Sequence, residues 1–441
     1  MNGENNNIPE GFKMTEIGLL PDEWETTKLG DLFEIKQGKA LSPGHRRGIS
    51  PRPFLRTANV FWGYLDLTTV DSMDFTDAEV SQLKLMPNDL LVCEGGDIGR
   101  TAIWRDESKV YCYQNHLHRL RTSRDDVHPL FYMYWMQVAY LLLRLYGGTG
   151  NKTTIPNLSQ SRLKSFVLPL PPLPEQKAIA RVLSTIQKAV ETQDKIIAAA
   201  RELKKSLMRH LFTYGPVPVA EAEKVPLKET EIGPVPEHWE VAILKQLGSL
   251  KDGDWILKSD YSKDGVRLLQ IADIGLGKFI NKSRRFISLQ RAQELGCTFL
   301  KGGDILISRM ADPIGRACML PDLPYPTITA VDVTIFRVNP DLVDSYYVLN
   351  ILNSEIALAQ AAQLAYGVTR NRVTRRNLER VLIPFPPLPE QQEIARMLLA
   401  VDNKIDAEEN RKAALQALFK TMLHQLMTGK VRVKGLEATA G

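Results

Sequence analysis

The chain has 441 residues, 44% of them hydrophobic and 24% charged, which is the composition of a globular protein with two or three domains. Lys and Arg outnumber Asp and Glu by 56 to 51, and this small positive charge is compatible with nucleic acid but below the strongly basic range. The four scattered cysteines exclude a disulfide framework and the lack of a long apolar run excludes a membrane-spanning class, so we expect a cytoplasmic protein.

The first half of the chain predicts a mixed domain of short strands and one apolar helix. β-rich runs at 90–93 and 102–104 flank the Gly-rich segment 95–100. That segment predicts a tight strand–turn–strand, since it resembles a phosphate-binding loop only superficially. The apolar stretch 129–146 then has the length of a helix.

A polar loop follows this helix. Residues 147–154 are small, hydroxylated and basic, and they precede a short helix predicted around 158–166. Free amides and the helix dipole at such a helix entry suit a phosphate group, and a solvated surface loop is the alternative. The second half has a counterpart at 366–372, before a short helix at 374–380. With other basic groups these loops supply the candidate DNA contacts: Arg46, Arg47, Arg56, Lys152, Thr153, Thr154, Arg284, Arg285, Thr369, Arg370, Arg372 and Arg375.

Each half ends in a long helix. The Pro-rich segment 168–174 cannot be helix interior, because proline lacks the amide donor, and Glu175 follows where the helix dipole favours a carboxylate. From there, residues recur at alternating spacings of four and three, which predicts a coiled-coil seam. The seam positions are Ile179, Leu183, Ile186, Val190, Gln193, Ile197, Ala200, Lys204, Leu207 and Leu211, and then Ile394, Leu398, Val401, Ile405, Glu408, Lys412, Leu415, Phe419, Met422 and Leu426.

The length of these helices argues for pairing. Each has about 38 residues and spans about 57 Å, which exceeds the width of a domain of this size. We therefore expect an antiparallel coiled coil about a pseudo-two-fold axis, with the polar residues Gln193 and Glu408 fixing its register. The alternative is that each helix packs only on its own domain.

The two halves repeat with one offset of 215 residues. The motif at 15–18 returns at 230–233, Trp24 returns as Trp239, and both tryptophans are expected to anchor the first strand in the core. A period this long makes each copy a whole domain. The expected architecture is α+β, with two similar mixed α/β domains joined by the two helices. The predicted boundaries are 1–174 and 230–389 for the domains, 175–212 and 390–428 for the helices, 213–229 for a linker and 429–441 for a C-terminal tail.

The sequence shows no catalytic centre. It contains no G-x-x-x-x-G-K-[ST] loop, no zinc-ligand spacing, and no Asn- or Asp-Pro-Pro-Tyr tetrad of the kind that amino-methyltransferases use on a flipped base. Cys112, His116 and His118 have no counterpart set in the second half, so we do not expect a metal site.

Several motifs together resemble those of the DNA-specificity (S) subunits of type I restriction-modification systems. They are the Thr-Glu-Ile-Gly and Trp-Glu opening, the Pro-Pro-Leu-Pro-Glu-Gln entry into each long helix, the recurrence of both, and the closing run 428–434. The resemblance covers about residues 10–434. It implies two target-recognition domains, each reading one half of a bipartite asymmetric DNA site, and no catalysis by this chain.

The resemblance also implies partners. Two methyltransferase subunits would dock on the repeated parts, and two restriction (translocase/nuclease) subunits would join them for cleavage. Cofactors would then belong to the partners, S-adenosylmethionine to the methyltransferase and ATP with magnesium to the nuclease. Since like surfaces bind like ligands, the candidate partner-binding residues lie at the start of each long helix: Glu175, Gln176, Ile179, Arg181, Glu390, Gln391, Ile394 and Arg396.

Two other functional classes compete with this interpretation. A stand-alone adenine methyltransferase would bind S-adenosylmethionine by itself. A pseudo-symmetric scaffold would not bind DNA, and a salt-dependent gel shift with random duplex would separate it from a DNA reader.

Overall fold

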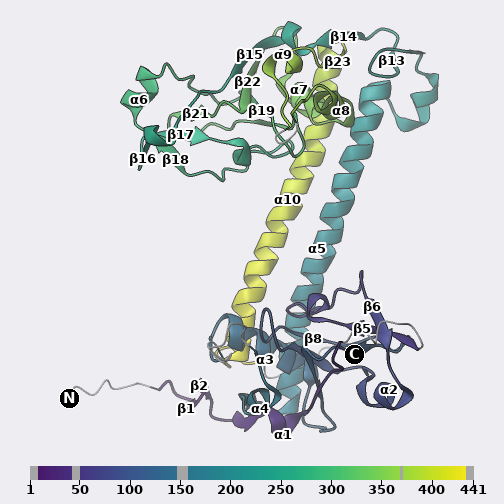
Figure 1. Cartoon of the computed structure of the whole chain (residues 1–441), viewed down its shortest axis with the longest axis vertical. Coiled ribbons are helices and arrows are strands. Elements are labelled where there is room, and N and C mark those ends of the chain that lie inside the picture. The colour runs from purple at the N-terminus through teal and green to yellow at the C-terminus, as the bar shows by residue number, and fades with distance from the viewer. Residues whose placement is uncertain (1–7, 42–49, 147–156, 368–370, 434–441) are drawn as a thin grey trace. The chain divides into compact units, whose positions relative to one another are not determined.

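The computed structural model describes residues 8–41, 50–146, 157–367 and 371–433 (Figure 1). The chain divides into two compact units: unit 1 is Met1–Gln193 with Arg411–Gly441, and unit 2 is Asp194–Asn410. Each unit combines small, mostly antiparallel sheets with helices, so the prediction of two α+β domains with long linking helices is confirmed. No helix within the described ranges is long and apolar enough to cross a membrane.

Unit 1 is built on a four-stranded antiparallel sheet in the order β4-β10-β7-β8, beside a three-stranded sheet β6-β5-β9. Two small pairs, β1-β2 and β3-β11, complete it. Its elements are β1 (Phe12–Thr15), β2 (Gly18–Pro21), β3 (Glu25–Lys28), α1 (Leu29–Leu32), β4 (Glu34–Gln37), β5 (Pro51–Leu55), β6 (Asp71–Asp74), α2 (Asp77–Leu83), β7 (Leu90–Cys93), β8 (Thr101–Ile103), β9 (Cys112–Tyr113), β10 (Leu117–Arg121), α3 (Pro129–Leu141), α4 (Gln160–Lys164) and β11 (Val167–Leu170).

Unit 2 repeats this plan with sheets β15-β22-β19-β20 and β16-β18-β17-β21. In Figure 1 the second of these sheets lies on the side of the first that faces away from α7 and α8. Its elements are β12 (Leu227–Lys228), β13 (Val235–Pro236), β14 (Glu240–Ile243), β15 (Gly248–Asp252), β16 (Tyr261–Ser262), β17 (Val266–Leu269), β18 (Arg285–Ile287), α6 (Leu289–Glu294), β19 (Ile305–Ser308), β20 (Ala317–Met319), β21 (Thr327–Thr329), β22 (Val333–Val338), α7 (Ser345–Leu352), α8 (Glu355–Gln363), α9 (Arg375–Leu378) and β23 (Leu382–Phe385).

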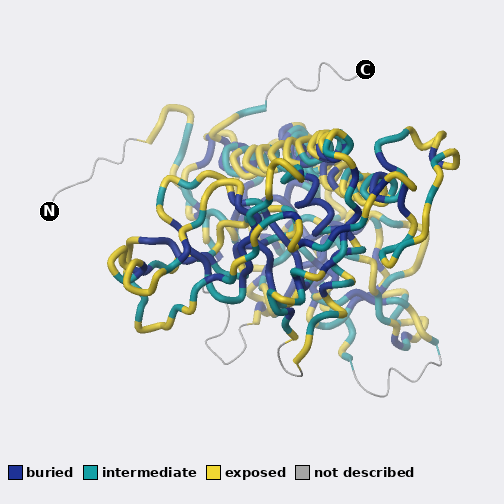
Figure 2. Tube along the Cα trace, turned by 90° about the horizontal axis from the view of Figure 1, so that it is seen from above, coloured by how far each residue is buried: buried dark blue, intermediate teal, exposed yellow. Residues whose placement is uncertain are grey.

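The central strands are buried on both faces. In β7, Leu90 and Val92 enter the core cluster that contains α3, whereas Leu91 and Cys93 enter a second cluster with Phe54. Successive strand residues point to opposite faces, so one short apolar run serves two cores. As predicted, residues 94–100 form the turn that joins β7 to β8. Figure 2 shows such buried stretches as dark blue segments of the trace.

The predicted helix at 129–146 is shorter than expected. Helix α3 ends at Leu141, and the amide of Leu145 donates to the carbonyl of Ala139, outside the helical pattern. Arg144 adopts the left-handed region with φ 53°, which a helix cannot continue through. The predictions for Trp24 and Trp239 are confirmed, since both indoles are fully buried.

The two long helices are α5 (Leu173–Tyr214) and α10 (Leu388–Met427). Each begins two residues before its predicted start, because Pro174 and Pro389 lie in the first turn, where no amide partner is needed. All seam positions predicted in both helices are buried or half-buried. Each helix contributes one half to each unit.

Within each unit the helix halves pack together. In unit 1, Ile179 and Leu183 of α5 share a core with Leu423 and Leu426 of α10. In unit 2, Leu211 shares a core with Ile394 and Leu398. Two ion pairs join the helices in unit 2, Arg201–Glu409 at 2.6 Å and Lys204–Asp402 at 2.7 Å. The residue number rises along α5 while that of the partner in α10 falls, so the two helix halves are antiparallel.

Candidate nucleic-acid interface

Both units bring the same four chain segments together at the end of their main sheet. In unit 1 the amide of Glu94 donates to the carbonyl of His116, and the amide of Leu158 donates to the carbonyl of Glu94. In unit 2 the equivalent bonds run from Arg309 to Asp332 and from Val373 to Arg309. We call these sites the junctions. Their side chains come from Gln37, Glu94, His116, His118 and Leu158 in unit 1, and from Asp252, Arg309, Asp332, Thr334 and Val373 in unit 2.

The junction of unit 1 is centred on an acid. Glu94 is 7% exposed, and its Oε2 accepts a hydrogen bond from the amide of Gln37 at 2.6 Å. His118 is fully buried, with its Nε2 2.9 Å from the carbonyl oxygen of Leu158 and 3.7 Å from Glu94. Because a carbonyl only accepts, this imidazole nitrogen must carry the proton. Gln37 and His116 are the exposed members of the junction.

Burial sets the charge of His118. Desolvation lowers the pKa of the imidazole, and the carbonyl of Leu158 and the nearby Glu94 oppose this shift only in part. Its other nitrogen, Nδ1, is buried without a hydrogen-bond partner. A neutral ring is therefore the form that this environment stabilises at neutral pH.

The junction of unit 2 reverses these charges. Arg309 stands where unit 1 has Glu94, and its guanidinium donates to Asp252, which stands where unit 1 has Gln37. Arg375 lies 3.6 Å from the other oxygen of Asp252, and Arg372 lies 3.3 Å from Asp332. These two arginines are about one-third exposed, so they present cations to solvent beside an ion pair in which Arg309 is buried and Asp252 is half-buried.

The structure places the predicted DNA contacts unevenly. Arg372 and Arg375 lie at the junction of unit 2. Arg56 pairs instead with Asp71 at 3.2 Å, and Arg284 and Arg285 lie in and beside β18 of the other sheet. Seven further candidates lie outside the described residues: Arg46, Arg47, Lys152, Thr153, Thr154, Thr369 and Arg370.

Most of the predicted partner contacts serve their own unit. Gln176 is buried and accepts from the amide of His128 while donating to the carbonyls of Asp126 and Pro171. In unit 2, Gln391 likewise accepts from the amide of Asp344 and donates to the carbonyls of Leu342 and Pro386. Ile179 and Ile394 are fully buried, and Glu175 and Glu390 accept hydrogen bonds from the two buried tryptophans. Arg181 and Arg396 are exposed.

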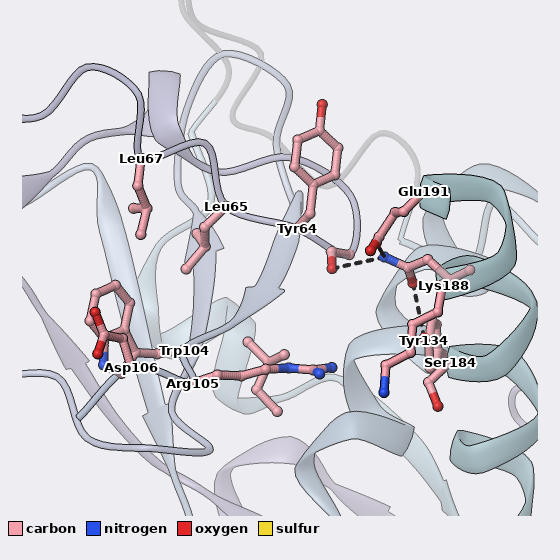
Figure 3. Close-up of a pocket in the computed structure, with 13 residues that line it drawn as sticks. Tyr64, Leu65, Leu67, Trp104, Arg105, Asp106, Tyr134, Ser184, Lys188 and Glu191 are labelled. Carbon is pink, nitrogen blue, oxygen red and sulfur yellow. Dashed lines mark hydrogen bonds between the residues drawn. The ribbon is translucent and has the colours of Figure 1, made fainter. Parts of the chain in front are cut away.

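A shallow pocket of about 290 Å³ lies in unit 1 between α3, α5 and the loop after β5 (Figure 3). Gln187 of α5 braces this loop, because it accepts from Tyr134 at 2.9 Å and donates to the carbonyl of Gly63 at 3.3 Å. Arg105 extends across the pocket toward α5 in Figure 3. In unit 2 the corresponding contact to the long helix is ionic, because Lys278 lies 2.8 Å from Asp406 and 2.9 Å from Glu409 of α10.

The titratable groups described give no sign of covalent chemistry. Burial raises the pKa of the Cys93 and Cys112 thiols to about 11, which keeps them protonated and poorly nucleophilic. Across the ranges that the structure covers, no group of three His, Cys, Asp or Glu side chains is arranged to hold a metal ion.

Gln37, Glu94, Asp252 and Arg309 were not among the predicted site residues. The predicted DNA contacts were basic or hydroxylated residues, whereas three of these four residues are acidic or neutral. A usable signal was present in the repeat, because Glu94 and Arg309 hold the same place in the two copies yet carry opposite charge. A position that keeps its backbone role and changes its chemistry is where two readers would differ.

The family profile described as type I restriction modification DNA specificity domain matches the chain twice, at residues 21–201 and 236–417. The chain is 26% identical to the type I restriction enzyme MjaVIII specificity subunit of Methanocaldococcus jannaschii, over 97% of both chains. It is 29% identical to the putative MjaX specificity subunit of the same organism, over 96% of this chain and 97% of that one.

Two solved structures share the fold. The S subunit of a type I restriction-modification system from M. genitalium superposes with a TM-score of 0.54 at 15% identity, covering 96% of this chain and 98% of that chain. A chain from a study of complex assembly and conformational transition in a type I R-M system gives a TM-score of 0.57 at 18% identity, covering 93% and 99%.

Proposed function

Because this chain belongs to the family of type I restriction-modification DNA specificity proteins, we propose that it is the non-catalytic subunit that reads DNA for such a complex. Each unit reads one half of a bipartite asymmetric site. The observation that carries this proposal is the pair of junctions, which share backbone hydrogen bonds and differ in the side chains they hold.

The chemistry of the junctions supports two different half-sites. Unit 1 offers the exposed amide of Gln37, held by the buried carboxylate of Glu94. Unit 2 offers the guanidinium groups of Arg372 and Arg375, each beside a carboxylate. Amide side chains pair with adenine edges and guanidinium groups with guanine edges in the major groove, so the two junctions favour different bases. The carboxylate partners hold the Gln37 amide and the two guanidinium groups in place before DNA binds. Less side-chain entropy is then lost on binding.

We propose that the repeated surfaces bind two methyltransferase subunits, with two restriction (translocase/nuclease) subunits joining them. The same turn recurs at Thr15 and Thr230, where each hydroxyl donates to the carbonyl of the glycine three residues later. The exposed Arg181 and Arg396 recur at the start of α5 and α10. Equivalent exposed groups in both units suit two copies of one partner.

The experiment that tests this function is long-read mapping of adenine methylation in host cells with and without the chain. We expect one bipartite motif to lose methylation when the chain is absent and to regain it on complementation. Gln37→Ala should then relax the motif in one half and Arg375→Ala in the other, with the opposite half unchanged. Methyl transfer by the purified chain alone, or a motif that both variants alter in the same half, would contradict the proposal.

A further inference from the structure

One backbone frame beside the junction is identical in the two units. The amide of Gly38 donates to the carbonyl of Leu117, and the amide of Gly253 donates to that of Val333. A Cβ at either glycine would lie 2.3 Å from a carbonyl oxygen of the neighbouring segment, so both positions require glycine. The next residues, Lys39 and Asp254, form the same isolated parallel bridge to the segment before β10 or β22.

The frame is fixed on its other side as well. Leu41 packs against the core cluster of Phe54 in unit 1, and Ile256 packs against that of Val266 in unit 2. One residue lies between the bridge residue and the packed residue in each unit. It is Ala40 in the first copy and Trp255 in the second. Both are exposed, and the exposed fraction of Trp255 is 69%.

The backbone around Trp255 is held by further polar contacts. The carboxylate of Asp254 accepts from the amide of Thr298 at 2.9 Å, and the amide of Leu257 donates to Asp260 at 2.8 Å. Asp260 is in turn paired with Arg291 at 3.0 Å. An exposed indole forgoes the stabilisation that burial would bring, and here a fixed backbone presents it to solvent, as in a preformed binding element.

The backbone segment of Trp255 lies beside arginines that are each paired with an aspartate. Three residues earlier, Asp252 bonds Arg309 and lies beside Arg375. Val333, which accepts from Gly253, directly follows Asp332, the partner of Arg372. Aromatic groups next to partly exposed arginines are suited to nucleic acid, because the cations meet phosphates while the ring stacks on bases. A methyltransferase that docks on both units would not require a tryptophan that only one unit has.

We propose that Trp255 stacks on, or wedges into, one base step of the half-site read by unit 2, a contact that unit 1 lacks at Ala40. This inference rests on the proposed DNA-reading function and names one residue that sets its specificity. Inserting side chains partly unstack a base step and favour steps that are easily deformed. The second half-site should therefore contain a position at which base identity matters through deformability and not through hydrogen bonds.

The test uses the full chain in complex with its methyltransferase subunits and duplexes that carry the mapped motif. 2-Aminopurine is placed at each position of both half-sites in turn. With the wild-type complex, we expect the emission to change at one step of the second half-site. Trp255→Ala should abolish this change and weaken specific binding by at least about fivefold, the lower end of what one stacked base contributes. Trp255→Phe should keep most of both effects.

Leu289→Ala is the matched control, since Leu289 is an exposed apolar residue of unit 2 on another element, α6. Melting curves and co-purification of the methyltransferase confirm that each variant is assembled. Unchanged affinity in Trp255→Ala, or loss of methyltransferase binding in place of DNA binding, would overturn the inference while the proposed function stands. Failure of the wild-type complex to bind the motif at all would overturn both.

Discussion

The indole nitrogen of Trp24 donates a hydrogen bond to the carboxylate of Glu175 across 2.9 Å, and both side chains are buried. Arg432 binds the same carboxylate through two nitrogens, at 2.6 and 2.8 Å. This contact holds the segment after α10 against the first strand region and the start of α5. In unit 2, Trp239 donates to Glu390 in the same way, but the second partner is His238, which is 57% exposed.

We expect Glu175→Gln to destabilise unit 1 by about 2 kcal/mol, because it removes charge-assisted hydrogen bonds from a buried site. Glu390→Gln should cost less than about 1 kcal/mol, since its ionic partner is largely solvated. Hydrogen exchange of peptides from each unit in the full chain measures both effects. Equal losses in the two units would contradict the assigned role of Arg432.

Acid should weaken unit 1 before the carboxylates titrate. Burial lowers the pKa of His118 and of His128 in the folded state, so the unfolded chain binds more protons below the ordinary histidine pKa of about 6.5. Stability is therefore full above about pH 6.5 and falls as the pH drops, by up to about 1.4 kcal/mol per pH unit for each histidine.

Melting curves between pH 7.5 and 5.5 test this expectation. His118→Gln can still donate to the carbonyl of Leu158 and should reduce the pH dependence, leaving the part that His128 contributes. A variant as acid-sensitive as the wild type would show that the His118 ring is not kept neutral.

Arg372 and Asp332 offer opposite tests of DNA contact. If Arg372 binds a phosphate, Arg372→Ala should lower the slope of log affinity against log salt by about 0.9. Asp332→Asn should tighten binding, because it frees the guanidinium from a competing carboxylate 3.3 Å away. Lys301→Ala, an exposed cation outside the junction, is the control. Identical salt slopes for all three variants would mean that Arg372 does not contact a phosphate.

The glycines that follow the two long helices should differ in their tolerance of a side chain. Gly215 and Gly429 have φ of 82° and 67°, a region that costs an L-residue roughly 1–2 kcal/mol. A Cβ at Gly215 would lie 3.3 Å from Trp239, whereas one at Gly429 would lie 2.2 Å from Pro21. Urea unfolding should therefore show a larger loss for Gly429→Ala than for Gly215→Ala.

A fragment of residues 1–212 should form a dimer. It lacks Leu423 and Leu426, which complete the core around Ile179 and Leu183, but it retains the equivalent Met208 and Leu211 at the end of α5. A second copy can supply them, and Gln193 would face the middle of its partner. With methyltransferase, the dimer should modify a palindrome whose half-site centres lie about one helical turn apart. Analytical ultracentrifugation and methylation mapping check this, with Leu211→Asp as the control that should remain monomeric.

The sequence was most informative where a local rule decides the structure. The proline barrier and the spacing from Ile179 onward located α5 to within two residues at each end, because both depend on backbone sterics and helical periodicity. The repeated Glu-Gln motif was assigned to partners, yet Glu175 and Gln176 bond within their own unit. A repeated motif indicates a repeated requirement, and it does not say whether that requirement is folding or binding.

The junctions could not be assembled from the sequence. Gln37, Glu94, His118 and Leu158 come from four separate segments, and only the sheet order β4-β10-β7-β8 brings them together. That order depends on pairings between distant strands, which no local pattern specifies.

The division of α10 between the units has a consequence for synthesis on the ribosome. Unit 2 is one continuous stretch, Asp194–Asn410, whereas unit 1 takes Leu423, Leu426 and Met427 into its core. Nascent domains usually complete their folding in the order in which they emerge. Here the core of unit 1, which is made first, stays incomplete until the last turn of α10 has left the exit tunnel, and unit 2 can complete its core before it. A chain that stops prematurely after residue 410 can therefore finish its C-terminal reader but not its N-terminal one.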